Sequence, residues 1–326
     1  MSPSPPSELA LSTVWSRALT MGGALAHDPD AEAAALLAAL EEAGLPGLEL
    51  EYRLSRPVLE RLLPELAPRG LKVVSLHSPV PLPPGVPRQA ANADIFSLAS
   101  LDAEVRRRGV DCALAALELA SDLEVKAVVL HLGNVEALVD KQVTPTAAQD
   151  GGLSNELHTM LAERAGLAPR HLDAVSFSLE RLAGRAAPLG VRLGLENRYH
   201  AFQIPDFAEL GLLLDRFRGA PLGLWYDCGH AWVQELAGLT PAADWLAAYG
   251  QGLVGCHLHD AVQAQDHQAP GLGEMDWPAL TRALAAAPVK VLEVPGGEMA
   301  DLRRGAAMLA GLFADAERAR EKEAQR

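Results

Sequence analysis

The stretch VRLGLEN (191–197) is an apolar, strand-like run that closes on an acid, Glu196. Five further apolar runs close in the same way, on His77, His131, Asp227, His257 and Glu293. A buried strand is expected to be apolar, so core packing does not explain why a metal-ligand type closes each of six successive runs. A metal site at the carboxyl rim of a parallel barrel requires such a pattern.

The order of apolar runs along the chain predicts the fold class. Short β-branched or leucine-rich runs alternate with longer alanine- and leucine-rich stretches, which indicates βα units and a parallel sheet. The expected strands are 10–15, 47–52, 71–77, 126–132, 191–197, 221–227, 252–258 and 289–294. The expected helices are 30–43, 55–69, 102–122, 155–189, 205–218, 240–250, 277–287 and 299–318. Eight such units predict an α/β fold, a (β/α)8 TIM barrel. A doubly wound sheet is the alternative, but no GxGxxG follows the first strand.

The barrel is expected to form a single domain over residues 9–318, between a disordered lead-in at 1–8 and a charged tail at 319–326. The helix at 30–43 has a start signal at Asp28 and a stop signal at Gly44. Two long loop-like segments, 78–100 and 133–154, follow strands and are expected at the catalytic rim, because long loops in a compact domain are usually functional.

Composition excludes several classes of function. The 326 residues carry a net charge of −14, which argues against a broad phosphate-binding face, so nucleic acid is not expected as a partner. No apolar run could span a bilayer, and the N-terminus lacks the pattern of a secretory signal. Three cysteines without ligand spacing indicate reduced thiols and a cytoplasmic protein. The GxSxG, HExxH, CxxC and P-loop motifs are absent.

The last four expected strands supply the central candidate site. They end on Glu196, Asp227, His257 and Glu293, and such strand ends converge on one axis in a barrel. Three carboxylates and one imidazole suit a divalent ion such as Mn²⁺, Co²⁺, Zn²⁺ or Mg²⁺. Each residue alone could instead cap a helix or pair with an arginine, but the four together favour a metal site.

Further residues could reach the same pocket. His77 and His131 end the third and fourth strands and could bind another metal or a substrate; a structural histidine is the alternative for each. His230 lies three residues after Asp227 and could bind a metal or a substrate oxygen. Predicted substrate contacts are His230, His267, Arg198 and Trp15. Arg198 could hold a phosphate or carboxylate, and Trp15 could form a wall of a sugar pocket.

The chain resembles the xylose-isomerase-like barrel superfamily, which includes sugar-phosphate isomerases and epimerases and the endonuclease IV type of apurinic/apyrimidinic endonuclease. The resemblance covers nearly the whole chain. The matching motifs are Glu196-Asn197-Arg198-Tyr199, Asp227-Cys228-Gly229-His230, His257-Leu258-His259-Asp260, Pro270 to Trp277, and Glu293.

The isomerase and epimerase branch implies one divalent metal held by the four ligands of the last strands. Glu196 and Glu293 would then also be the catalytic acid–base groups. One would remove a proton beside a metal-polarised carbonyl to give a metal-stabilised enediolate, and the other, or a bound water, would return a proton. His230 would hold a substrate oxygen. The expected function is therefore metal-dependent isomerisation or epimerisation of a small sugar or sugar phosphate. The resemblance also leaves a homo-oligomer open.

The endonuclease branch implies a three-metal phosphodiesterase, and this is the alternative function. His77, His131 and Glu196 would hold one metal. The third metal would need His230 and an Asp-x-His pair, whereas Asp266 is directly followed by His267, so this spacing argues against a third site. Known sugar epimerases lack counterparts of the first two histidines, which leaves a dinuclear isomerase, dehydratase or hydrolase open. A barrel that binds a sugar or metal without turnover is a third alternative.

Overall fold

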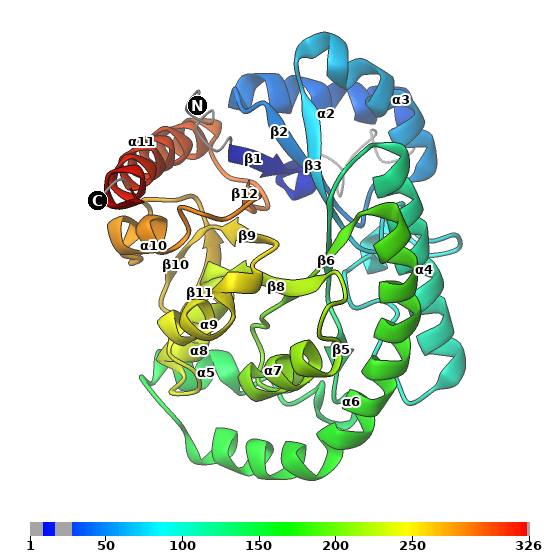
Figure 1. Ribbon diagram of the computed structural model, residues 1–326, viewed down its shortest axis with the longest axis vertical. Coiled ribbons are helices and arrows are strands. Elements are labelled where there is room, and N and C mark those ends of the chain that lie inside the picture. Colours follow the sequence, from blue (N-terminus) through cyan, green and yellow to red (C-terminus); the bar gives the residue numbers. More distant parts are fainter. Residues whose placement is uncertain (1–8, 17–27, 325–326) are drawn as a thin grey trace.

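The computed structural model describes residues 9–16 and 28–324. At its centre is a closed barrel of parallel strands in the order β1-β12-β9-β8-β6-β4-β3-β2 (Figure 1). The strands are β1 (Leu9–Ser12), β2 (Gly47–Leu50), β3 (Lys72–His77), β4 (Ala127–Leu130), β6 (Arg192–Glu196), β8 (Leu222–Asp227), β9 (Gly255–Leu258) and β12 (Lys290–Leu292). Each falls within or beside one of the eight predicted runs, so the predicted (β/α)8 barrel is confirmed.

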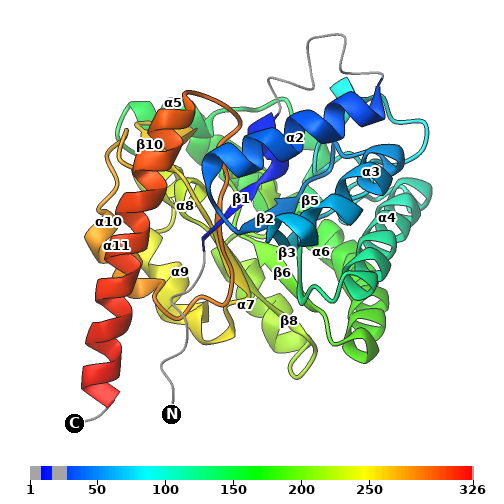
Figure 2. The same ribbon diagram turned by 90° about the horizontal axis from the view of Figure 1, so that it is seen from above.

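Helices surround the barrel, as Figure 2 shows from above. They are α2 (Pro29–Ala43), α3 (Arg56–Leu66), α4 (Ala103–Asp122), α6 (Asn155–Leu189), α7 (Phe207–Arg216), α8 (Cys228–Leu236), α9 (Ala242–Tyr249), α10 (Trp277–Ala283) and α11 (Met299–Ala324). The predicted boundaries of α2 are confirmed: the Asp28 carboxylate accepts hydrogen bonds from two backbone N–H groups of the first turn, and Gly44 ends the helix at φ 70°.

The carboxyl rim is more ordered than the sequence predicted. The segment 133–154, expected as a loop, contains β5 (Gly133–Asn134) and the short helix α5 (Thr144–Gln149). β5 pairs with β7 (Gln203–Ile204), and β10 (Asp260–Val262) pairs with β11 (Gln265–Gln268) in a hairpin. These pieces are too short to show a helical or strand period, which is why the pattern of the sequence did not indicate them.

The barrel interior is filled by one large aromatic side chain. Trp225 on β8 is fully buried, and its ring lies across the two neighbouring strands. A Cβ atom at Gly255 would be 2.3 Å from this ring and one at Gly194 2.9 Å, so both positions require glycine. Small and β-branched residues such as Ala10 and Val291 complete this layer. The layer closes the barrel below the rim.

The last helix, α11, packs against the barrel through Leu302, Leu309 and Phe313. The predicted lead-in at 1–8 lies outside the described residues, and α11 continues as a helix to Ala324, past the expected start of the tail. Among the described residues, no helix has the length and apolar character needed to cross a membrane.

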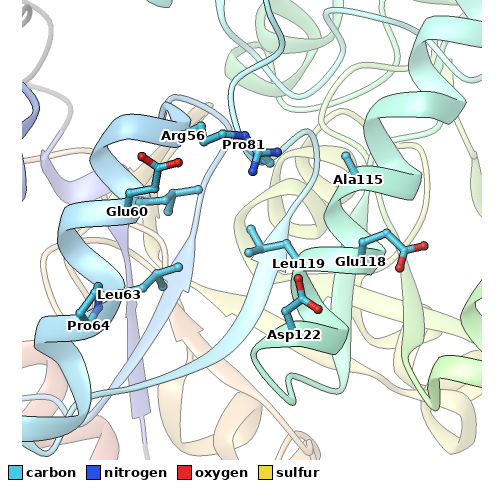
Figure 3. Close-up of a pocket in the computed structure, with 10 residues that line it drawn as sticks. Arg56, Glu60, Leu63, Pro64, Pro81, Ala115, Glu118, Leu119 and Asp122 are labelled. Carbon is cyan, nitrogen blue, oxygen red and sulfur yellow. The ribbon is translucent and has the colours of Figure 1, made fainter.

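A groove of about 500 Å³ opens between α3 and α4 on the outer surface (Figure 3). Leu63 of α3 faces Leu119 of α4 across it, with Pro81 at one end. Leu59 and Ala115 also line the groove. None of the predicted site residues lines this groove, so it is separate from the metal-ligand cluster at the rim.

Candidate metal centre

The four ligands predicted from the last four strands meet at the carboxyl end of the barrel. They are at most 6% exposed: Glu196, Asp227, His257 and Glu293. The parallel register places Asp227 on β8 directly opposite His257 on β9. Nδ1 of His257 lies 3.3 Å from Oε1 of Glu196, 3.6 Å from Oδ2 of Asp227 and 3.0 Å from Oε2 of Glu293. One potential ligand atom from each residue lies within 4.8 Å of the others.

The electrostatics of this cluster fit a divalent cation. Burial alone would raise the pKa values of Glu196, Asp227 and Glu293, but neighbouring imidazoles hold each pKa well below its usual range. Burial would lower the pKa of His257, yet Glu293 and Glu49 raise it well above the usual range. The three carboxylates therefore stabilise a positive charge close to Nδ1 of His257. In addition, Oε2 of Glu196 is a buried acceptor without a hydrogen bond, as expected of an atom that binds a cation.

His77 and His131 lie on the other side of Glu196, where the sequence analysis placed them. Nε2 of His77 is 3.4 Å and Nε2 of His131 is 2.9 Å from Oε2 of Glu196. Their rings are 4.9 Å apart and nearly perpendicular. The two imidazoles and the carboxylate could hold a second cation beside the first, with Glu196 shared between them.

Two imidazoles at the centre, those of His77 and His230, are each held in place by a backbone carbonyl at Nδ1. Nδ1 of His77 contacts the carbonyl of Ser78 at 3.2 Å, and Nδ1 of His230 contacts the carbonyl of Asn197 at 3.0 Å. A carbonyl oxygen can only accept, so each Nδ1 donates and each Nε2 keeps its lone pair. This leaves Nε2 as the atom available to a metal or a substrate.

Two histidines of the centre contact carboxylates that the sequence analysis did not identify. Oε1 of Glu49 lies 3.1 Å from Nε2 of His257, and Oδ2 of Asp94 lies 3.1 Å from Nδ1 of His131. A carboxylate behind a histidine fixes its tautomer and raises its basicity as a ligand. An acid within the apolar run GLEL was a usable signal for Glu49, whereas Asp94 lies in the long loop 78–100 without a distinguishing pattern.

The hairpin after β9 brings a third group to the centre. Potential ligand atoms of His230, Asp266 and His267 lie within 4.8 Å of one another, although the spacing of the last two argued against such a site. Adjacent residues in a strand normally face opposite sides, but His267 has a φ of +60°, which breaks this alternation. Nδ1 of His267 is 3.0 Å from Oδ1 of Asp266. The broken spacing therefore does not keep these three side chains apart, and the absence of a third metal stays a prediction.

A buried acid organises the segment that joins this hairpin to α10. The carboxylate of Asp260 accepts hydrogen bonds from the backbone of Gly271 at 2.8 Å and Met275 at 3.2 Å, and from the indole of Trp277 at 2.8 Å. Gly273 is required because its Cβ would lie 2.3 Å from this carboxylate. The stretch Pro270 to Trp277 is therefore folded around Asp260, close to the site.

The other two predicted substrate contacts differ in position. Arg198 is buried beside the centre: its Nη2 donates to Oδ2 of Asp94 at 2.8 Å, and its Nη1 lies 3.9 Å from Oε2 of Glu196. Trp15 follows β1, is 7% exposed and packs in the main hydrophobic core. Its role as a wall of a sugar pocket stays a prediction.

A second acid lies at the end of β2. Glu51 is buried and accepts a hydrogen bond from Arg53 at 2.9 Å, and Arg53 in turn lies over the ring of Tyr52. Burial raises the pKa of Glu51 to about 7, against the lowering effect of Arg53. The rim thus carries, beside the metal-ligand cluster, a carboxyl group that titrates near neutral pH.

Comparison with known proteins places this barrel in a family. The chain matches the model described as "Xylose isomerase-like TIM barrel" over residues 37–312. The chain belongs to this family. The uncharacterized protein y4fM of Sinorhizobium fredii is 28% identical over 182 residues, which are 56% of this chain, and the chain spans about half the length of that relative.

Several solved structures share the fold over most of their length. L-ribulose 3-epimerase is 19% identical, with a TM-score of 0.66 and 97% of each chain covered. The 3-keto-D-glucoside 4-epimerase YcjR of E. coli is 17% identical, with a TM-score of 0.62, and the match covers 93% of this chain and 98% of that one. At these identities the likeness shows the barrel fold.

Proposed function

We propose that this protein is a metal-dependent isomerase or epimerase of a small sugar or sugar phosphate. The observation that carries the proposal is the convergence of Glu196, Asp227, His257 and Glu293 within 4.8 Å at the carboxyl rim. Solved sugar epimerases share this fold. Their names give L-ribulose and a 3-keto-D-glucoside as their substrates. A site of this composition is suited to proton transfer next to a carbonyl.

The two glutamates would be the acid–base pair. When bound, a divalent ion held by the four ligands supplies Lewis-acid polarisation of the substrate carbonyl. Glu196 ends β6 and Glu293 follows β12, and they approach Nδ1 of His257 at 3.3 Å and 3.0 Å. In the proposed mechanism they lie on opposite sides of the substrate. One carboxylate takes the proton from the carbon next to the carbonyl. The other glutamate, in its protonated form, or a water molecule then gives a proton to the opposite face or to the neighbouring carbon.

Residues of α8 and the β10–β11 hairpin would hold the substrate. His230 presents Nε2 as an acceptor, because its Nδ1 donates to the carbonyl of Asn197. Burial lowers the pKa of His230, which keeps this ring neutral and able to accept from a sugar hydroxyl. Burial would also lower the pKa of His267, but Asp266 raises it well above the usual range, so this ring is a donor for a carbonyl or hydroxyl oxygen.

The test begins with the metal content per chain, measured by mass spectrometry on gently purified protein. One ion, preferably Mn²⁺ or Co²⁺, supports the proposal and leads to assays on panels of ketoses and ketose phosphates. A metal-loaded protein that is inactive across these panels would overturn the proposed substrate class. We also propose that the enzyme works in the cytoplasm, since Cys112, Cys228 and Cys256 are unpaired.

A metal-dependent phosphodiesterase is the second candidate function. It is favoured by the two further groups around the centre, namely His77 and His131 beside Glu196 and the cluster of Asp266 with His267. Several adjacent divalent ions are typical of phosphodiester hydrolysis. Two or three zinc ions per chain, together with cleavage of abasic DNA or a phosphodiester, would support this candidate over the isomerase, despite the net charge of −14.

A further inference from the structure

His259 contacts residues of the metal centre, but neither proposed mechanism gives His259 itself a role. It is fully buried, two residues after His257, so the alternation along an extended chain turns both rings to the same side. Nε2 of His259 is 3.0 Å from Oδ1 and 3.0 Å from Oδ2 of Asp227. Potential ligand atoms of Asp227, His259, His267 and Glu293 lie within 4.8 Å of one another. Distances alone would therefore make His259 a metal ligand.

The second ring nitrogen of His259 determines which role is chemically available. The backbone N–H of His267 points at Nδ1 of His259, with a donor–acceptor distance of 2.8 Å. A backbone N–H can only donate, so Nδ1 must carry a lone pair and the ring proton must be on Nε2. Nε2 therefore faces the carboxylate of Asp227 as a hydrogen-bond donor and has no lone pair to offer a metal.

The surroundings hold this ring in one orientation. A Cβ atom at Gly229 would lie 2.0 Å from Cε1 of His259, so the glycine of the DCGH motif provides the space that the ring occupies. The thiol of Cys228 donates to the carbonyl of His259 at 3.2 Å. On its open face the ring stacks on His267, with centroids 4.1 Å apart and an interplanar angle of 8°.

We propose that His259 is a positioning residue and not a metal ligand. Its Nε2–H orients the carboxylate of Asp227 towards the metal, and its Nδ1 ties the β10–β11 hairpin to that same ligand. The hairpin carries Asp266 and His267 on the substrate-binding side of the pocket. His259 therefore links the position of this hairpin to the orientation of the Asp227 carboxylate. This inference rests on the metal centre of the proposed function but not on the reaction performed there.

The two contacts of His259 can be separated by substitution. His259→Ala removes both the donor to Asp227 and the acceptor for the His267 N–H. His259→Asn keeps an acceptor close to the position of Nδ1 but removes the donor at Nε2. His171→Gln is the matched control, because His171 is also buried and also bonds to the backbone, at the carbonyl of Ala99, away from the metal centre.

Three quantities are measured without substrate: metal ions per chain by mass spectrometry, metal affinity by chelator competition, and hydrogen exchange of the hairpin amides. We expect an unchanged number of ions in both His259 variants and an affinity about 10- to 100-fold weaker, as is typical when a residue behind a ligand is lost. Exchange in the hairpin should be faster in His259→Ala than in His259→Asn. His171→Gln should match the wild-type protein in all three quantities.

Each other outcome overturns the inference in a distinct way. Loss of one ion per chain in both His259 variants would make His259 a ligand. Unchanged affinity and unchanged exchange would make it an ordinary core histidine. If His259→Ala does not fold, His259→Asn still decides between these cases. A wild-type protein that binds no divalent ion would instead overturn the metal centre itself, and with it the proposed function.

Discussion

Oε1 of Glu49 lies 3.1 Å from Nε2 of His257, on the opposite side of the ring from the three carboxylates that surround Nδ1. Glu49 is fully buried inside the barrel on β2, and Oγ of Ser75 donates to its other oxygen at 2.8 Å. The order Ser75, Glu49, His257 forms a chain of hydrogen bonds that ends at Nε2 of His257, across the ring from Nδ1. The carboxylate holds the ring proton on Nε2, which leaves Nδ1 free as a ligand.

Glu49→Gln should weaken metal binding about 10- to 100-fold without changing the number of ions per chain. The amide oxygen can still accept from Nε2 of His257, but it lacks the negative charge that raises the basicity of Nδ1. Chelator competition measures the affinity, and Ser75→Ala should give a smaller loss because it removes only a donor to Glu49. Equal affinity in Glu49→Gln and wild-type protein would contradict this role.

Glu293→Gln should lower turnover on the order of 10²- to 10⁴-fold while the fold is retained. Glu293 is predicted to transfer a proton, and an amide cannot. Its side chain is almost the same size, so the unfolding midpoint in thermal denaturation should stay close to that of the wild-type protein. Full activity in this variant would rule out the acid–base role of Glu293.

His77→Ala tests for a second metal ion. Nε2 of His77 lies 3.4 Å from Oε2 of Glu196, and its Nδ1 is engaged by the carbonyl of Ser78. In a protein that binds a second ion beside Glu196, this substitution should lower the metal count by one ion per chain, measured by mass spectrometry. An unchanged count leaves His77 as a substrate contact or a structural residue.

Glu51 should make the stability of the protein depend on pH in the neutral range. Burial raises its pKa from 4.5 to about 7 in the folded protein. A carboxyl group with a raised folded pKa contributes stability that is fully present below the unfolded pKa of 4.5 and is lost as the pH rises through about 7. The amide introduced by Glu51→Gln cannot ionise. Over this pH window the free energy of unfolding of the variant should therefore fall by roughly 2–3 kcal/mol less than that of the wild-type protein.

Denaturant titrations of both proteins across that pH window measure this difference in slope. The absolute stability of the variant also reflects the altered contact with Arg53, so only the pH dependence decides. Parallel curves for the variant and the wild-type protein would show that Glu51 does not titrate in this range.

Arg164 joins α6 to the start of α7. It is 5% exposed and donates to both carboxylate oxygens of Glu209, at 2.8 Å and 2.7 Å, and to the carbonyl of Gln203 at 2.9 Å. Arg164→Met should lower the free energy of unfolding by about 3–5 kcal/mol, because it leaves a buried carboxylate unpaired. Chemical denaturation measures the loss.

The matched control for Arg164 is an arginine–glutamate pair that also forms two hydrogen bonds but lies on the surface. Arg185 pairs with Glu118, and both side chains are more than 40% exposed. Arg185→Met should lower the free energy of unfolding by less than about 1 kcal/mol, since exposed pairs contribute little. Losses of similar size in the two variants would mean that burial does not determine the strength of these pairs.

The sequence by itself determined the barrel and the four residues that meet at its rim as proposed metal ligands. Eight apolar runs separated by helix-forming stretches suffice for the fold, because burial of a parallel sheet on both faces requires continuous apolar strands. Polar residues that close such strands, as Glu196 and Glu293 do, must gather at one rim in any closed parallel barrel. These features follow from periodicity and order, which are properties of the chain alone.

The tertiary structure decided which side chains support the ligands and how the rim folds. Glu49 and His257 are far apart in sequence, and only the curvature of the barrel brings their side chains to 3.1 Å. The left-handed backbone at His267 brings its side chain close to that of Asp266, which the spacing of the two residues did not indicate. The role of His259 depends on one backbone N–H eight residues further along the chain. Hydrogen-bond direction and ring tautomer arise from packing between segments, and no local sequence pattern encodes them.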